Sequence, residues 1–153
     1  MRFNKKIKGL AYLSLLIVLA LLALAATASL RLGEAIQKRE AEEELLWIGL
    51  QLRAALVSYA NATPPHGKRL PTSLQDLLKD TRSSLPRRHL RKIYVDPITK
   101  QAEWGLIYSA DGSGIVGVHS LSNGVPIKVA NFPIELKQLE NQASYQFWVF
   151  LID

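Results

Sequence analysis

Residues 10–30 decide the fold: they read LAYLSLLIVLALLALAATASL and contain no charged side chain. A helix of this length extends about 31 Å, which matches the hydrocarbon core of a bilayer. The stretch therefore predicts a transmembrane helix. Only about 120 residues of the chain then remain for a folded domain, which is enough for a modest core.

The basic residues of the chain are concentrated before this apolar stretch. Arg2, Lys5, Lys6 and Lys8 precede it, and the first acidic residue is Glu34. The chain has 19 basic and 13 acidic residues, so without these four its net charge of +6 falls to +2. Basic residues beside a span hold that end in the cytoplasm. We therefore expect a single-pass inner-membrane protein with a cytoplasmic N-terminus and a periplasmic head.

The helical pattern continues beyond residue 30. Apolar residues recur at spacings of three and four along one face, at Leu45, Ile48, Leu52, Leu56 and Tyr59. Segment 34–44 is strongly charged, and we expect it to be solvated just outside the membrane. The sequence predicts one long helix over residues 10–60, which ends in the proline- and glycine-containing stretch 61–68.

The remaining residues predict a short helix and a small antiparallel sheet. Thr72 or Ser73 is expected to cap the short helix, with Gln75 or Asp76 completing a capping box. Aromatic and branched residues predict strands over 103–110, 115–121 and 145–152, the first two joined by a hairpin turn at 111–114. Three strands bury only one face, so we expect the sheet to pack on the long helix in an α+β fold.

The residue types argue against an enzyme. The chain has no cysteine, which excludes disulfides and thiolate chemistry. His66, His89 and His119 lack metal-ligand spacing, and we expect each in a loop or on the surface. The DGSG sequence at 111–114 lacks the repeated oxygen donors of a calcium loop. No nucleophile elbow or phosphate loop is present, so we predict no catalytic residue, metal or cofactor.

A basic cluster near the middle of the chain allows two interpretations. It could contact DNA or anionic headgroups. With a head charge of only +2 and no interleaved aromatic residues, we instead expect a solvated surface balanced by acidic residues 42–44, and no nucleic-acid partner. The cluster comprises Arg87, Arg88, His89, Arg91 and Lys92.

The three tryptophans, Trp47, Trp104 and Trp148, also allow two interpretations. They could anchor a partner protein. In a head with so little core, we expect them to pin the sheet to the helix.

The ordered set of motifs resembles the type IV pilin and type II secretion pseudopilin superfamily. Lys8-Gly9 directly before the apolar helix resembles a prepilin-peptidase site. The head resembles a subgroup of bacterial type II secretion pseudopilin-like proteins over nearly its whole length. The shared motifs are LLWIG at 45–49, Tyr59, Thr63-Pro64, Leu70-Pro71, Leu74-Asp76-Leu77-Leu78, PRRHLR at 86–91, Asp96-Pro97, Trp104-Gly105-Leu106, Gly117-Val118, Ser120 and Trp148.

The resemblance implies a pilin-like fold and an assembly function. It implies a leader over residues 1–9, cleavage after Gly9, methylation of Leu10, a transmembrane half-helix over 10–30 and a periplasmic head over 31–153. The implied partners are a prepilin peptidase, other pseudopilins, an assembly platform and inner-membrane lipid. The assembly surface would be the apolar helix, represented by Leu10, Leu13, Ser14, Ile17, Leu21 and Leu24.

Two departures from the family pattern bear on the type of subunit. Typical members begin the mature chain with Phe and have Glu at its fifth position, where this chain has Leu10 and Ser14. That glutamate is thought to neutralise the terminal amine of a neighbouring subunit, which a serine cannot do. This difference favours a minor or tip-proximal subunit. Residues 120–124 lack the carboxylates of the family's calcium loop, so no calcium site is carried over.

Alternatives remain open at this stage. The Ala26-Thr27-Ala28 sequence fits a signal-peptidase site that would release a periplasmic domain from Ser29, and an uncleaved anchor is a third form. The main functional alternative is a monomeric, membrane-anchored binding or adaptor protein. A DNA-uptake pseudopilin is a further one.

Overall fold

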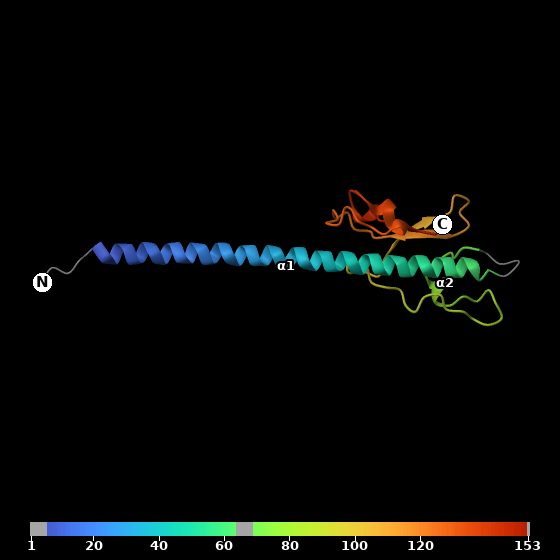
Figure 1. The fold of residues 1–153 in the computed structure, drawn as a ribbon. Coiled ribbons are helices and arrows are strands. Elements are labelled where there is room, and N and C mark those ends of the chain that lie inside the picture. Colours follow the sequence, from blue (N-terminus) through green and yellow to red (C-terminus); the bar gives the residue numbers. More distant parts are fainter. Residues whose placement is uncertain (1–5, 64–68, 153) are drawn as a thin grey trace. The chain divides into compact units, whose positions relative to one another are not determined.

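The computed structural model describes residues 6–63 and 69–152, without the side chains of residues 6–9 and 25–31. The chain divides into two compact units, Met1–Lys38 and Arg39–Asp153. Helix α1, Lys6–Asn61, contributes to both and covers the helix predicted over 10–60 (Figure 1). In the described part of the first unit, α1 is the only element. We call Arg39–Asp153 the head.

The head adds a small sheet and several short helices to α1. The sheet has the order β1-β2-β3, and both pairs of strands are antiparallel. Val118 at its centre lies opposite Leu106 on one side and Phe150 on the other. The elements are α2 (Gln75–Leu78), β1 (Gly105–Tyr108), β2 (Ile115–His119), the 3-10 helices η1 (Ile134–Leu139) and η2 (Tyr145–Phe147), and β3 (Phe150–Leu151). The fold is thus α+β, as predicted.

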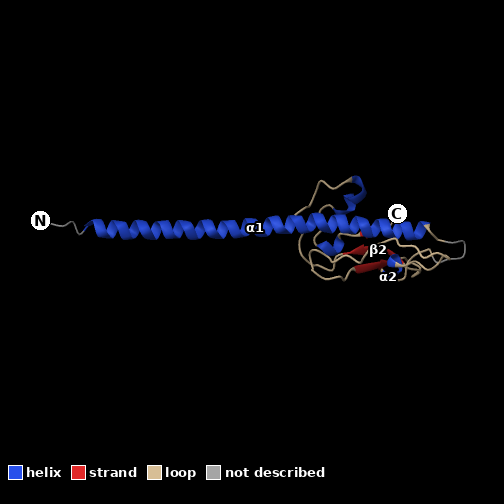
Figure 2. Ribbon diagram, turned by 90° about the horizontal axis from the view of Figure 1, so that it is seen from below, coloured by secondary structure: helices blue, strands red, loops and turns tan. Residues whose placement is uncertain are grey.

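The core joins α1 to the sheet and to the segments around α2 and η1, and Figure 2 shows the sheet beside α1 in the head. Leu45, Leu52 and Leu56 of α1 are completely buried, which confirms the apolar face predicted from their spacing. The phenyl ring of Phe150 approaches the helix where Gly49 has no side chain, and a Cβ there would collide with it. The glycine therefore allows strand β3 to pack closely on α1.

The short elements follow the prediction in part. The hairpin of β1 and β2 is confirmed, and Gly112 in its turn has a positive φ of 68°. Asp76 Oδ2 accepts hydrogen bonds from the backbone N–H groups of Thr72 and Ser73 at 2.8 and 3.0 Å, which is one half of the predicted capping box. No side-chain hydroxyl caps α2 in return.

The predicted strand over 145–152 is wrong in its first half. Residues 145–147 form η2, and only residues 150–151 pair as β3. The side chain of Tyr145 is completely buried and its hydroxyl group binds Glu42, so a tertiary contact overrides the local β propensity. Helix η1 was not predicted either, and it buries Leu136 and Leu139 in the core.

The tryptophans divide into two groups. Trp104 and Trp148 are buried, as expected for residues that join the sheet to the helix. Trp47 is 52 % exposed, and its ring and that of Tyr94 meet edge to face with centroids 5.5 Å apart. The expected core role is therefore wrong for Trp47, because its helical position faces the surface beside segment 87–94.

Candidate functional site

The first candidate site is the apolar surface of α1 in the N-terminal unit. Leu10, Leu13, Ile17, Leu21 and Leu24 are each between 53 and 68 % exposed. Contiguous apolar surface of this kind marks contact with a membrane or with another protein. The described residues of this unit thus present the predicted assembly residues outward.

Ser14, at the fifth position of the predicted mature chain, uses its hydroxyl group within its own helix. Its Oγ donates to the carbonyl oxygen of Ala11 at 2.9 Å, a common arrangement for serine inside a helix. A hydroxyl group in this position offers no charge to a neighbouring amine.

The predicted leader and span lie partly outside the described residues. Residues 1–5 are outside them, and Lys8 and Gly9 belong to α1 without described side chains. Among the residues that are described, no helix is long and apolar enough to cross a membrane. The side chains of residues 25–30, in the last third of the predicted span, are not among those described.

Glu42 is a buried carboxylate, which corrects the expectation that segment 34–44 is solvated throughout. Its side chain is 2 % exposed and accepts hydrogen bonds from the backbone N–H groups of Ile127 and Lys128 at 2.5 and 3.0 Å. Tyr145 Oη donates a third bond at 2.7 Å. Burial, followed by this hydrogen bond, raises the pKa of Tyr145 well above its ordinary value. One carboxylate of α1 thus fixes two distant segments of the head.

A second buried polar cluster lies at the C-terminal end of α1. Ser58 Oγ is 2.8 Å from His89 Nδ1, and His89 Nε2 is 3.1 Å from Asp80 Oδ2. The side chains of His89 and Asp80 are only 4 and 3 % exposed. His89 lies in a loop, as expected, but its side chain is buried and not on the surface. His66 lies outside the described residues, and His119 is half-buried at the end of β2.

Arg82 completes this cluster. Its guanidinium donates to both carboxylate oxygens of Asp80, at 2.9 and 2.7 Å. These bonds are the main cause of a pKa for Asp80 far below the ordinary carboxyl range. Arg82 also donates to the carbonyl oxygen of Tyr59 at 2.7 Å, satisfying a group that α1 leaves open at its C-terminus.

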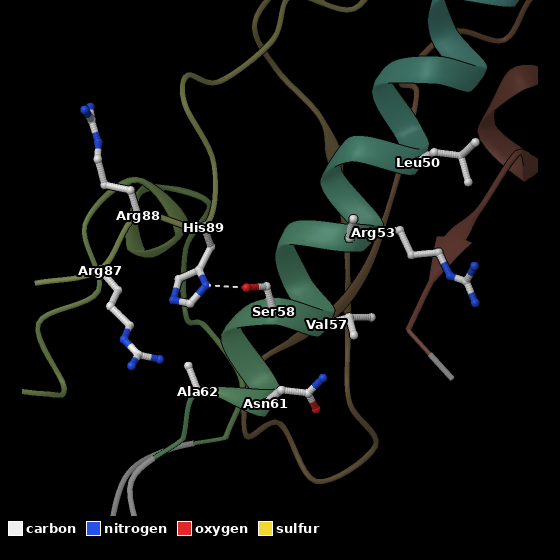
Figure 3. A pocket seen from close by; sticks show the side chains of 10 residues that line it. Leu50, Arg53, Val57, Ser58, Asn61, Ala62, Arg87, Arg88 and His89 are labelled. Carbon is white, nitrogen blue, oxygen red and sulfur yellow. Dashed lines mark hydrogen bonds between the residues drawn. The ribbon is translucent and has the colours of Figure 1, made fainter.

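A pocket of about 940 Å³ lies beside Ser58 (Figure 3). In Figure 3 the Ser58 hydroxyl group and the His89 ring point toward one another, from α1 and from the segment that carries residues 87–89. Arg88 points away, whereas Arg87 extends toward Ala62 on the side of His89. No acidic side chain is among its lining residues, Leu50, Arg53, Ala54, Val57, Ser58, Asn61, Ala62, Arg87, Arg88 and His89.

The basic cluster is exposed, as predicted, at Arg87, Arg88, Arg91 and Lys92. The Lys92 ammonium lies 5.4 Å from the centre of the Tyr94 ring, so one aromatic residue does accompany the cluster. Sequence spacing gave no sign of this contact or of the Ser58–His89–Asp80 cluster. The cluster arises from the packing of segment 80–89 against α1, which no local pattern specifies, whereas Lys92 and Tyr94 are two positions apart in one segment.

Comparison with protein-family models, curated proteins and solved structures yields no match for this chain. Within the described residues, no three carboxylate, histidine or cysteine side chains are grouped to hold a metal ion.

Proposed function

We propose that the protein is a pilin-like, pseudopilin-type subunit of a type II secretion or type IV pilus-like assembly. The carrying observation is the contrast within α1: the leucines from 10 to 24 are exposed, whereas Leu45, Leu52 and Leu56 are completely buried. One part of this helix packs against the head, and another part leaves its apolar side chains exposed. Such a helix is suited to lateral packing with lipid or with like helices.

The proposed mechanism is transfer of α1 between two apolar surroundings. The N-terminal part of α1 resides in the inner membrane with the basic leader in the cytoplasm and the head in the periplasm. An assembly platform then moves it into a bundle of like helices. Because lipid and leucine are similarly apolar, the transfer costs little hydrophobic free energy, so packing detail decides the outcome.

The head has a mechanical part in this proposal. Glu42 ties α1 to segment 127–128 and to Tyr145, and Arg82 ties its C-terminal end to Asp80. Both contacts connect the helix to segments far away in sequence. A force on α1 would pass through these contacts to the segments they hold, as a subunit pulled through its helix requires.

Ser14 supports a minor or tip-proximal position in such an assembly. In a packed bundle, an amine at Leu10 of a neighbour would need a charged partner, and Ser14 provides only a neutral hydroxyl group that is already bonded to Ala11. The same observation favours the second candidate, a monomeric membrane-anchored adaptor that never polymerises.

Mass spectrometry of the intact protein from its native membrane tests the proposal. We expect a chain that begins at N-methylated Leu10, the product of prepilin processing. A chain that begins at Met1 would favour the plain anchor, and one that begins near Ser29 would indicate signal-peptide cleavage. Either of these two results would remove the pilin mechanism.

A further inference from the structure

We propose that Ser58 is a nucleophile activated by His89, and that the pocket beside it accepts a small anionic ester. The proposal is independent of the assembly function, which requires no chemistry. It rests on the geometry of the cluster, on its pattern of burial and on the charge of the pocket.

The geometry favours the tautomer of His89 that a general base requires. Asp80 accepts two hydrogen bonds from the Arg82 guanidinium and lies 3.1 Å from His89 Nε2. A carboxylate can only accept, so Nε2 carries the hydrogen and donates it. In the neutral ring this leaves a lone pair on Nδ1, which is 2.8 Å from Ser58 Oγ. Nucleophile, base and positioning carboxylate therefore stand in the order that serine hydrolases use, although the two ring nitrogens have exchanged roles.

The burial of these groups suits the same roles. The side chains of His89 and Asp80 are nearly inaccessible, and the Tyr59 ring packs edge-on against His89 with centroids 5.4 Å apart. The backbone N–H of His89 donates to the carbonyl oxygen of Leu77 at 2.9 Å, which fixes the base from its main chain. Ser58, in contrast, is exposed and lines the pocket. A held base beside an accessible hydroxyl group is the arrangement that nucleophilic catalysis needs.

The pocket favours an anionic substrate. Its lining includes three arginines and no carboxylate. Arg53 donates to the carbonyl oxygen of Leu151, and Arg88 points away in Figure 3. Arg87 is the cation that extends on the side of His89, and its guanidinium suits a carboxylate. We therefore assign Arg87 to the acid group of a short ester that also carries a free carboxylate.

The reaction proceeds in two balanced steps. Ser58 Oγ attacks the ester carbonyl carbon while His89 Nδ1 takes the hydroxyl proton, and the bond to the leaving alkoxide breaks as that oxygen receives the proton. Water then attacks acyl-Ser58, which releases the acid and restores the serine. Because Ser58 lies inside α1, its own N–H is used in the helix and offers no hydrogen bond to the oxyanion. We therefore expect slow turnover and readily detected acyl-Ser58.

A fluorophosphonate probe tests the nucleophile directly in the full-length chain in detergent micelles. Attack by Ser58 Oγ forms a P–O bond, breaks the P–F bond and releases fluoride, and His89 takes the proton. We expect the adduct on Ser58, located by peptide mass spectrometry. Its rate of formation should fall by about tenfold or more in His89→Gln, which removes the base. Ser109→Ala is the matched control, because Ser109 Oγ donates to Asp111 and has no imidazole partner.

A second variant keeps the test decisive if His89→Gln does not fold. Ser58→Cys leaves every partner in place and introduces one thiol into a chain without cysteine. Alkylation by iodoacetamide at neutral pH should be about tenfold faster than in Ser109→Cys, because a neighbouring imidazole promotes the thiolate. Equal alkylation rates would overturn the proposal, as would adduct formation on Ser58 no faster than on Ser109.

The substrate class has its own measurement. 4-Nitrophenyl succinate carries a free carboxylate, whereas 4-nitrophenyl butyrate does not. We expect faster acylation of Ser58 by the succinate than by the butyrate, and loss of that preference in Arg87→Gln. Equal rates for the two esters would refute the role of Arg87 and the anionic substrate.

Discussion

The two units of the chain use the same residue in opposite ways. In the N-terminal unit, Leu10, Leu21 and Leu24 of α1 are 60 to 68 % exposed, whereas Leu45, Leu52 and Leu56 in the head are completely buried. Helix propensity and hydrophobicity are identical in the two sets. The difference lies in what packs against the leucines. In the head, the sheet packs on them, whereas the described residues of the first unit place nothing against the side chains of Leu10 and Leu21. Under the proposed function, the exposed leucines of this helix contact lipid or like helices.

The two α1 glycines described in detail repeat the contrast. A Cβ at Gly33 in the N-terminal unit would meet nothing within 4 Å, whereas one at Gly49 in the head would meet the Phe150 ring. The first site has room for a side chain and the second has none. The same substitution can therefore be made in each unit, and its effects on stability can be compared.

The largest effect is expected from truncating a leucine. Leu52→Ala should lower the free energy of unfolding of the head by about 2–5 kcal/mol, because a cavity replaces a completely buried side chain. Leu21→Ala, in the exposed set, should change it by less than about 0.5 kcal/mol. Denaturant titration of both variants in detergent micelles measures the two free energies of unfolding. Equal losses would break the comparison.

A smaller effect is expected from adding one methyl group. Gly49→Ala should destabilise the head by about 1–3 kcal/mol, because the Phe150 ring and strand β3 must shift. Gly33→Ala should be neutral or should stabilise the helix by up to about 1 kcal/mol, because alanine is the better helix former and has room. Thermal unfolding followed by circular dichroism compares them. A stabilising Gly49→Ala would contradict the close packing of β3 on α1.

Glu42 and Glu43 provide a third pair, now within the head. Glu42→Gln should cost about 1–2 kcal/mol, because an amide NH₂ replaces one of the oxygens that accept from Ile127, Lys128 and Tyr145. Glu43→Gln changes an exposed side chain and should have no measurable effect. Denaturant titration at neutral pH gives both values. If the two variants proved equally stable, Glu42 would not join the helix to the head.

The smallest and most gradual effect is that of acid. The folded-state pKa of Asp80 lies below its ordinary value of 3.8, so Asp80 contributes stability above that value and loses it as the pH falls further. Unfolding measured from pH 5 to pH 2 should therefore show decreasing stability, with a shallower slope in Asp80→Asn. The slope should not vanish, because the pKa values of Asp76 and Asp111 are lowered too. An unchanged slope would exclude Asp80 as a contributor.

Sequence analysis predicted the parts of the fold that depend on periodicity. The spacing from Leu45 to Leu56 identified the buried face of α1, and the DGSG turn identified the hairpin. It failed where a distant contact decides the local structure, as at Tyr145, which forms a 3-10 turn because its hydroxyl group reaches Glu42. The charged sequence around Glu42 also led to the wrong prediction that its side chain is solvated. A carboxylate that accepts three hydrogen bonds can be buried without an opposite charge.

The candidate sites differ in the same way. The exposed apolar helix was predictable, because a run of leucines is visible in one stretch of sequence. The Ser58–His89–Asp80 cluster was not, because Ser58 and Asp80 are 22 positions apart and no motif connects them. Only the packing of segment 80–89 on the end of α1 brings their side chains within hydrogen-bond distance.

The most direct test of the central claim is site-specific photo-crosslinking from the exposed part of α1. A benzophenone amino acid at Leu21, in cells that contain the native assembly system, should form covalent products with other helical membrane subunits or with a second copy. The same group at Lys137, exposed in η1, is the matched control and should form few. Products with lipid alone at Leu21 would contradict assembly through this helix and would leave α1 as a simple anchor.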